Sequence, residues 1–289
     1  MPELPEVENA RRLIAEQALG RRIVTVDNID TFVCRPHSPE ELRAALTGRM
    51  LTAAHRRGKM MWCETSPPPG GPPEPGPDLG IHLGMSGRIA ITLPDGQWAE
   101  AGDWPTWGAR PRKAEWNRFT LEFADGRRLA LFDPRRLGRI RLNPDIDALG
   151  PDAERVTQAE FRVLITKGTT TVKARLLDQS KIAGLGNLLT DEILWQAKVP
   201  PALPVSRLRR ADADRLYHAM RSALESAIAK GGAHTGAVIA ARHPGGTCPR
   251  DGAEMRHGTV GGRSTWWCSR EQALPGDLLP GAAASPRAS

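Results

Sequence analysis

The 289-residue sequence lacks the usual marks of export, membrane insertion and disulfide stabilisation. No basic segment with a short apolar stretch follows Met1, and no apolar run of about 18 residues occurs. Only four cysteines are present, at positions 34, 63, 248 and 268, and their spacing is too scattered for a disulfide framework. No internal repeat is found either. We therefore expect a cytoplasmic protein without membrane contact.

Positive charge is what the sequence has in excess. Lys and Arg number 40 against 33 Asp and Glu, which gives a net charge of +7 and a pI of about 9.7. This balance favours a polyanionic partner, nucleic acid first. Hydrophobic residues make up 40% and charged residues 25%, as in globular proteins, and the length suggests one or two domains.

Three segments of biased composition divide the chain. The Pro-rich stretch 64–80 cannot form a helix or a central strand, so we expect an exposed loop there. A linker is expected at 143–154 and a disordered tail at 272–289. The sequence therefore predicts one domain over 1–143 and a second that begins at 144.

The first half reads mainly as β-structure. Strand-like patterns cover 23–29, 60–65 and 80–93. Residues 117–133 predict a hairpin, because apolar residues alternate on both sides of an Asp125-Gly126 turn. A helix is expected near the start of the chain, ending at Gly20. Strands spread over this length indicate a sandwich or a barrel.

The second half reads as α-helix, which makes the fold class α+β. Helices are predicted at 157–168, 170–179, 187–198 and 210–232. The second and third flank a glycine-rich turn, and a long helix follows. Such helical modules can bind a DNA backbone, although most helical hairpins have no nucleic-acid ligand.

The amino terminus, PELPEVE, raises a chemical possibility. Removal of Met1 would expose Pro2 as a secondary amine with a pKa of about 8. Such an amine can attack an aldehyde-like carbon and form an iminium ion. Glu3 is then a candidate general acid/base, and Glu6 a candidate for positioning the amine or the substrate. Taken alone, the segment fits an ordinary solvated terminus equally well.

Five motifs follow one another along the chain: PELPEVE, RRGKMM (56–61), HLGMSG (82–87), DPRRLG (133–138) and DQSKIAGLGN (178–187). Together they resemble the formamidopyrimidine-DNA glycosylase and endonuclease VIII family, over residues 2–270. The resemblance implies an amino-terminal β-sandwich flanked by helices, then a helix–two-turn–helix domain over 144–240 with a zinc-finger-like hairpin over 241–271. It also implies a nucleoid-associated, monomeric repair enzyme without an obligate protein partner, acting on double-stranded DNA with oxidised or abasic sites.

The resemblance also assigns roles to individual residues. Pro2 would be the nucleophile of a DNA glycosylase with AP lyase activity, forming an iminium that leads to β- and δ-elimination. The DNA contacts implied are Lys59, which also assists catalysis, the wedges Met85 and Leu137, Arg135 toward the orphaned base, and the phosphate ligands Asn187 and Arg263. Without the motifs, Lys59 would count as solvated and Met85 as core. A non-catalytic paralogue that binds damaged DNA is the alternative.

The carboxy-terminal hairpin departs from the family's four-cysteine zinc site. Cys248 and Cys268 hold two of the four positions, but Asp251 and Glu271 stand at the others. Structural zinc sites use Cys and His almost exclusively, so we expect a zincless finger and no cofactor, with Trp266 and its neighbour supplying packing instead. An unusual zinc site, a ligand borrowed from a histidine (His243 or His257) and a disulfide between the two cysteines stay open as alternatives.

Substrate preference is the second departure. The loop motifs resemble the purine-directed branch, yet Leu137 stands where Phe is common. The stretch from 230 to 248 is also short for a loop that folds over flipped 8-oxoguanine. We therefore expect better activity on formamidopyrimidines, abasic sites or further-oxidised bases than on 8-oxoguanine.

Overall fold

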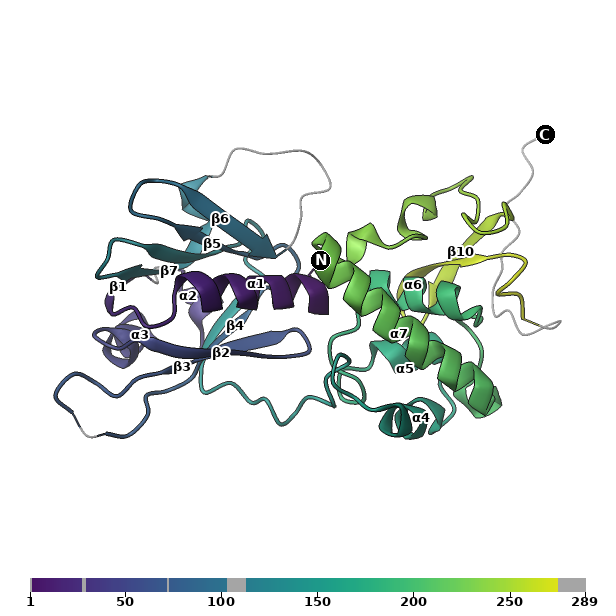
Figure 1. Cartoon of the computed structure of the whole chain (residues 1–289), viewed down its shortest axis with the longest axis horizontal. Helices are drawn as coiled ribbons and strands as arrows, with labels where there is room; N and C mark the ends of the chain where they lie inside the picture. Colours follow the sequence, from purple (N-terminus) through teal and green to yellow (C-terminus); the bar gives the residue numbers. More distant parts are fainter. Residues whose placement is uncertain (1, 28–29, 72, 103–112, 275–289) are drawn as a thin grey trace. The chain divides into compact units, whose positions relative to one another are not determined.

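The computed structural model describes residues 2–27, 30–71, 73–102 and 113–274, which fall into two compact units (Figure 1). The first unit comprises Met1–Leu149 and Ile228–Ala233, and the second comprises Gly150–Ala227 and His234–Ser289. The expected boundary after residue 143 lies close to this division. A separate hairpin domain at 241–271 stays a prediction, and most of the expected tail lies outside the described residues.

Two antiparallel sheets form the first unit. One has the strand order β1-β7-β8-β5-β6, and the other has the order β2-β3-β4-β9. The strands of the first sheet are β1 (Ile23–Asp27), β7 (Asn117–Phe123), β8 (Arg128–Phe132), β5 (Arg88–Thr92) and β6 (Trp98–Gly102). Those of the second are β2 (Leu51–Arg57), β3 (Met60–Thr65), β4 (Leu79–His82) and β9 (Arg139–Leu142). The predicted β-sandwich is confirmed.

Helix α1 (Leu4–Gln17) packs against both sheets, contacting β5 and β6 on one side and β2 and β3 on the other (Figure 1). Its buried face includes Val7, Ala10 and Ile14, which join one core with the inward residues of the strands. The amino terminus is therefore tied into the sandwich rather than frayed.

The predicted hairpin at 117–133 is confirmed. Leu121 pairs with Leu129 across β7 and β8, and Gly126 takes a φ of 83° in the turn, which favours glycine. Two short helices of this unit, α2 (Thr31–Cys34) and α3 (Pro39–Leu46), were not predicted. The start of α3 carries a readable signal, because Ser38 caps it and proline follows.

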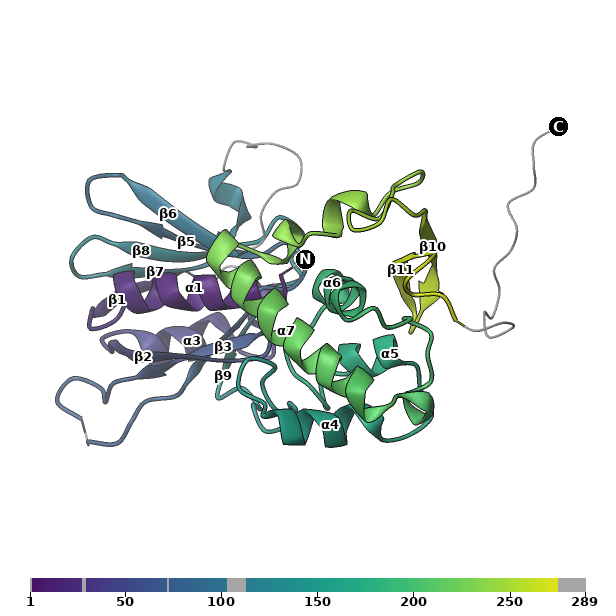
Figure 2. The same ribbon diagram turned by 45° about the vertical axis from the view of Figure 1, so that its right-hand side comes forward.

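The second unit is mainly helical, with a two-stranded hairpin. Its helices are α4 (Gln158–Thr166), α5 (Val172–Leu177), α6 (Asn187–Ala197) and α7 (Arg210–Lys230), the last of which ends in the first unit. The hairpin strands are β10 (Met255–Val260) and β11 (Arg263–Cys268), and β11 contacts α6 (Figure 2). Helix α4 begins at the predicted Thr157 cap, where Glu160 completes a capping box.

Short 3-10 turns complete the described structure at Ala114–Trp116, Val205–Arg207, Ala233–Thr235 and Ile239–Ala241. In the Pro-rich stretch, residues 66–71 and 73–78 contain no helix or strand. Among the helices described, none has the length and apolar character needed to cross a membrane.

Candidate active site

The amino-terminal motif forms the entry to α1. Pro2 is buried, and Glu3 is fully buried in extended backbone immediately before the helix. Pro5 occupies the first turn of the helix, where a backbone N–H has no intrahelical partner, so the proline costs no hydrogen bond. The prolines at positions 2 and 5 are thus compatible with a helix that starts at Leu4.

Glu6 holds this entry in place. Its Oε2 accepts a hydrogen bond from the Glu3 backbone N–H at 2.9 Å, and its Oε1 accepts one from the Ala233 N–H at 2.6 Å. Burial raises the pKa of Glu6, although these two backbone donors act in the opposite direction. Both carboxyl oxygens are therefore engaged, and the position of the first turn is fixed.

Lys59 lies in the turn between β2 and β3, directly after Gly58, whose φ is 59°. The neighbouring Arg56 is buried; its Nε donates to Glu8 Oε2 at 3.0 Å and its Nη1 to the Gly58 carbonyl at 3.1 Å. These two hydrogen bonds of Arg56 link the turn that carries Lys59 to the first turns of α1. The structure thus holds Lys59 and the amino terminus on one framework.

His82 was missed by sequence reasoning, although it lies in the HLGMSG motif. It pairs with Met60 across β3 and β4, beside Lys59. Its Nδ1 accepts the Gly84 N–H at 3.0 Å, which leaves the ring proton on Nε2. Burial lowers the pKa of His82, and the charges of Lys59 and Arg139 lower it further. A neutral imidazole with an Nε2 donor therefore stands next to Lys59.

The two predicted wedge loops meet at Asp133, which is fully buried. Its Oδ1 accepts the Ser86 hydroxyl at 2.7 Å and the Arg135 N–H at 3.1 Å, and its Oδ2 accepts the Gly138 N–H at 2.6 Å. One carboxylate thus fixes both the loop after β4 and the loop after β8.

The wedge side chains themselves project from these loops. Met85 is 40% exposed, Arg135 is exposed and Leu137 is half-buried. The backbones approach so closely that a Cβ on Gly84 would lie 2.4 Å from the Leu137 carbonyl carbon. Met85 is therefore not a core residue, which was its ordinary interpretation.

Asn187 and Arg263 lie together in the second unit. Asn187 begins α6, and its Nδ2 donates to the Ser264 carbonyl at 2.9 Å, next to exposed Arg263 at the start of β11. Fully buried Lys173 also donates to the Ser264 carbonyl, at 3.2 Å, and its Nζ lies 2.6 Å from Asp191 Oδ1. The Ser264 carbonyl therefore holds the Asn187 side chain beside Arg263, so the two predicted phosphate ligands lie close together.

The hairpin base contains an incomplete set of metal donors. One ligand atom each from Cys248, Asp251 and Cys268 lies within 4.8 Å of the others, and both thiols are unlinked. Glu271 is engaged elsewhere, by Lys198 at 2.6 Å and by Arg250. Three converging donors with a diverted fourth do not fit a four-ligand structural zinc site.

Packing surrounds these donors instead. The Trp195 Nε1 donates to Cys248 Sγ at 3.3 Å, and Trp266 packs against the same apolar cluster. His257 stacks on Trp266 and bonds to Ser264, while His243 bonds to the Pro244 carbonyl. Among the described residues, neither histidine joins the cysteine cluster.

Family sequence models cover most of the chain. The formamidopyrimidine-DNA glycosylase N-terminal domain matches residues 1–140, and the formamidopyrimidine-DNA glycosylase H2TH domain matches residues 148–238. The chain belongs to the formamidopyrimidine-DNA glycosylase family. The family assignment drawn from the five motifs is thereby confirmed, as is the expected fold.

Individual relatives agree with this membership. The formamidopyrimidine-DNA glycosylase of Chloroflexus aurantiacus is 30% identical over 293 residues, covering 93% of this chain and 96% of that protein. The Arabidopsis thaliana glycosylase is 34% identical over 245 residues, and the matched region spans 79% of this chain but only 58% of that longer relative.

Solved structures of the family have the same fold. A Lactococcus lactis Fpg in complex with DNA containing an abasic site superposes with a TM-score of 0.75 at 26% identity, covering 94% of this chain and all of that one. A MutM complex with DNA containing carbocyclic 8-oxo-G has the same TM-score, at 27% identity and the same coverage.

Proposed function

We propose that this chain removes oxidised bases from double-stranded DNA in base excision repair and then cleaves the abasic strand. Its family is one of DNA glycosylases, and the solved relatives carry DNA with an abasic site, an oxidised pyrimidine or an 8-oxoguanine analogue. Those ligands belong to the relatives, and they support DNA as the partner here. The net charge of +7 suits the same partner.

The first chemical step is assigned to Pro2. With Met1 removed, its amine attacks C1′ of the flipped nucleotide, a C–N bond forms, and the base leaves with its bonding pair and a proton. Sugar ring opening then gives an iminium ion. We assign the proton transfers in both events to Glu3, and its burial next to Pro2 supports this assignment. Glu6 positions the pair through its bonds to the backbone of Glu3 and Ala233.

The iminium makes strand cleavage possible. It acidifies the hydrogens on the adjacent sugar carbon, so that the 3′ phosphate leaves by β-elimination and the 5′ phosphate by δ-elimination. Lys59 and the Nε2–H of His82 lie side by side and can contact a phosphate of the lesion strand. In the second unit, Asn187 and Arg263 are assigned the same task.

Base extrusion is assigned to the loops tied by Asp133. Removing a base from the stack costs a few kcal/mol, which must be offset by groups that fill the gap. Met85 and Leu137 are apolar wedges, and the exposed Arg135 guanidinium can donate to the orphaned base. Because one carboxylate positions both loops, these side chains can act together.

The arrangement of Glu3 and Glu6 at the buried entry of α1 is the observation that carries this proposal. Damage binding alone requires neither a buried carboxylate beside Pro2 nor a second one that fixes it. The alternative is a non-catalytic paralogue, which would keep the fold and bind damaged DNA but neither remove the base nor cleave the strand.

Borohydride trapping on a duplex with an abasic site separates the two functions. The protein is first checked by intact mass for removal of Met1. We expect a covalent adduct that maps to Pro2. Pro2→Gly, whose terminal primary amine can still form a trappable imine, should lose most base excision while retaining most DNA affinity. Tight binding without an adduct, from protein with a processed terminus, would establish the non-catalytic alternative.

A further inference from the structure

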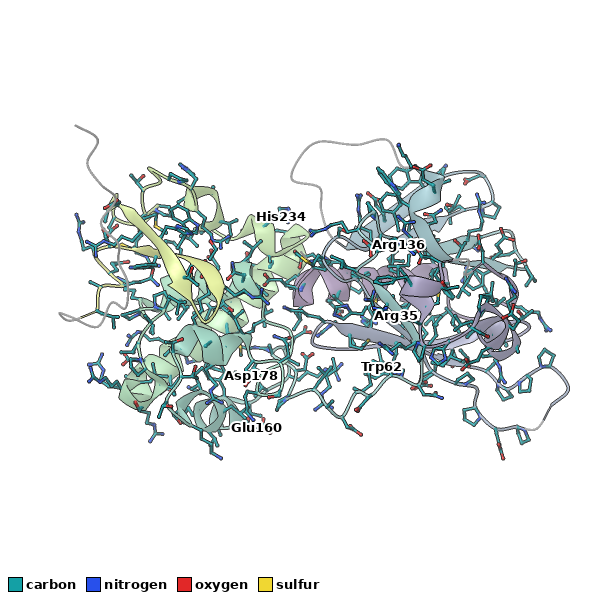
Figure 3. The ribbon with its side chains drawn as sticks, turned by 180° about the vertical axis from the view of Figure 1, so that it is seen from behind. Arg35, Trp62, Arg136, Glu160, Asp178 and His234 are labelled. Atoms are coloured by element: carbon teal, nitrogen blue, oxygen red, sulfur yellow. The ribbon has the colours of Figure 1, made fainter. Side chains whose placement is uncertain are left out.

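A cluster of arginines surrounds one half-exposed aromatic ring on the first unit, outside the groups assigned above. We call it the Phe32 surface; it comprises Phe32, the three arginines over its ring (Arg35, Arg136 and Arg139), and Arg141, which lies two residues beyond Arg139 on β9 and whose charge acts on Arg139. The Phe32 ring, on α2, is 37% exposed. The guanidinium carbons of Arg35, Arg139 and Arg136 lie 4.0, 4.8 and 5.3 Å from its centroid. Figure 3 labels Arg35 and Arg136 on this unit.

The surface carries more positive charge than its neighbours neutralise. Two carboxylates act on it, Asp133 and Asp30. Both oxygens of Asp30 accept from Arg136 at 2.8 Å, and Arg118 lies 3.6 Å from Asp30. Arg35 and Arg141 are exposed and make no ion pair within the part of the chain that the structure describes. Burial lowers the pKa of Arg139, and the charges of Arg35 and Arg141 lower it further. Like charges held this close favour an anionic ligand.

The Phe32 surface is continuous with the proposed phosphate contacts. Arg139 on β9 pairs with His82 on β4, and His82 pairs with Met60, the residue after Lys59. Neighbouring strands are about 4.8 Å apart, so the backbone positions of Lys59 and Arg139 lie within about 10 Å of each other across the sheet. Arg35, directly after α2, extends this line because it contacts the same Phe32 ring as Arg139.

We propose that the Phe32 surface binds the phosphodiester backbone of duplex DNA, as an extension of the interface at Lys59 and the wedge loops. Guanidinium groups bind phosphate oxygens through paired N–H donors. The Phe32 ring holds the Arg35 guanidinium in place by cation–π contact, and this guanidinium makes no hydrogen bond among the described residues, so its N–H groups can donate to a phosphate. The contact is with the backbone, so it strengthens binding to damaged and undamaged duplexes alike.

The inference rests on the proposed function, but its test measures DNA binding alone and needs no catalysed reaction. Affinity for an undamaged duplex is measured against salt concentration for the wild type, Arg35→Ala, Arg141→Ala and the double variant. Each lost phosphate contact reduces the slope of log K against log salt by about 1, so the double variant should lose about 2. Arg35→Lys, which keeps the charge, should retain the wild-type slope.

Arg43→Ala is the control, because Arg43 is an exposed arginine on α3 of the same unit that pairs with Glu40 and is not among the arginines over the Phe32 ring. It should leave the slope unchanged. An unchanged slope in the double variant, or an equal loss in Arg43→Ala, would overturn the assignment of this surface. Borohydride trapping by the wild type is scored separately, so failure of the Pro2 chemistry is recognised independently of this result.

Discussion

Arg56 Nε lies 3.0 Å from Glu8 Oε2, and both side chains are almost completely buried. The contact joins residues 48 positions apart, one on the first helix and one beside the turn that carries Lys59. It connects the two parts of the chain to which the proposed chemistry is assigned. A salt bridge buried this deeply is costly to break from one side, because the remaining charge has no water to replace its partner.

Glu8→Gln tests this connection through its pH dependence. Burial opposes ionisation, but hydrogen bonds from Arg11, Arg12 and Arg56 outweigh it and lower the pKa of Glu8 from 4.5 to about 2. The ionised form therefore stabilises the fold fully above about pH 4.5, and this contribution is lost as the pH falls toward 2. At neutral pH the variant should lose about 3 kcal/mol of unfolding free energy.

Urea unfolding at a series of pH values measures the effect. The difference between wild type and Glu8→Gln should be constant from about pH 7 to 5.5 and shrink below about pH 4.5. Glu16→Gln, an exposed position on the same helix, is the control and should be neutral. A difference that grew on acidification would contradict the assigned role of Glu8.

Glu3→Gln should separate the two proposed activities. Loss of a general acid/base costs roughly 100-fold or more in rate, so excision of an oxidised base should fall by at least that factor. A preformed abasic site has no base to displace, and its cleavage should fall less. Single-turnover rates on the two duplexes give the comparison; equal losses on both would remove Glu3 from the base-release step.

Asp133→Asn should uncouple the wedge loops. An amide cannot accept all three of the donors that reach Asp133, and a buried unpaired donor costs about 1–3 kcal/mol. We expect slower excision and a weaker fluorescence change from 2-aminopurine placed next to the lesion, which reports wedge insertion. Ser86→Ala removes only one of these bonds and should show a smaller loss.

Asp125→Asn supplies the control for this pair, because Asp125 is partly exposed in the β7–β8 turn of the same unit. It should leave excision and the fluorescence change at wild-type levels. Normal wedge insertion in Asp133→Asn would mean that the loops hold their shape without the shared carboxylate.

The sequence predicted the elements that have strong local signals. The Asp125-Gly126 hairpin and the Thr157-capped helix depend on residues within a few positions of each other, and both are present. The Ser38 cap of α3 was an equally local signal that was overlooked. The family motifs supplied the candidate site residues, whose roles stay predictions.

Contacts between distant segments could not be predicted in this way. No periodicity in the sequence pairs Glu8 with Arg56, or Asp133 with the loop that contains Ser86, because each contact depends on how strands and helices pack. The Phe32 surface is of the same kind, since its arginines come from the residue directly after α2, from β9 and from the loop between β8 and β9. The burial of Glu8 and Asp133 and the clustering of the arginines can be recognised only once the three-dimensional structure is known.

Lesion preference is expected to follow the short connection between α7 and the hairpin. Residues 231–247 form two 3-10 turns, and the backbone N–H of Val238 is held by Glu192 at 2.9 Å. A tethered, short segment offers little loop to fold over a flipped purine. Formamidopyrimidine should therefore be excised faster than 8-oxoguanine in matched duplexes, and equal or faster release of 8-oxoguanine would reverse this ordering.

Metal content tests the altered hairpin. Protein prepared without chelator should contain well under one zinc per chain by mass spectrometry of the metal, because Glu271 is held by Lys198 and Arg250 and only three donors converge. The double variant Asp251→Cys with Glu271→Cys restores four thiols at the family's spacing and should bind about one zinc. Adding Cys268→Ser to that variant should abolish the gain. One tightly held zinc in the wild type would instead mean that the carboxylates ligate metal, and that the hairpin is a finger with mixed sulfur and oxygen ligands.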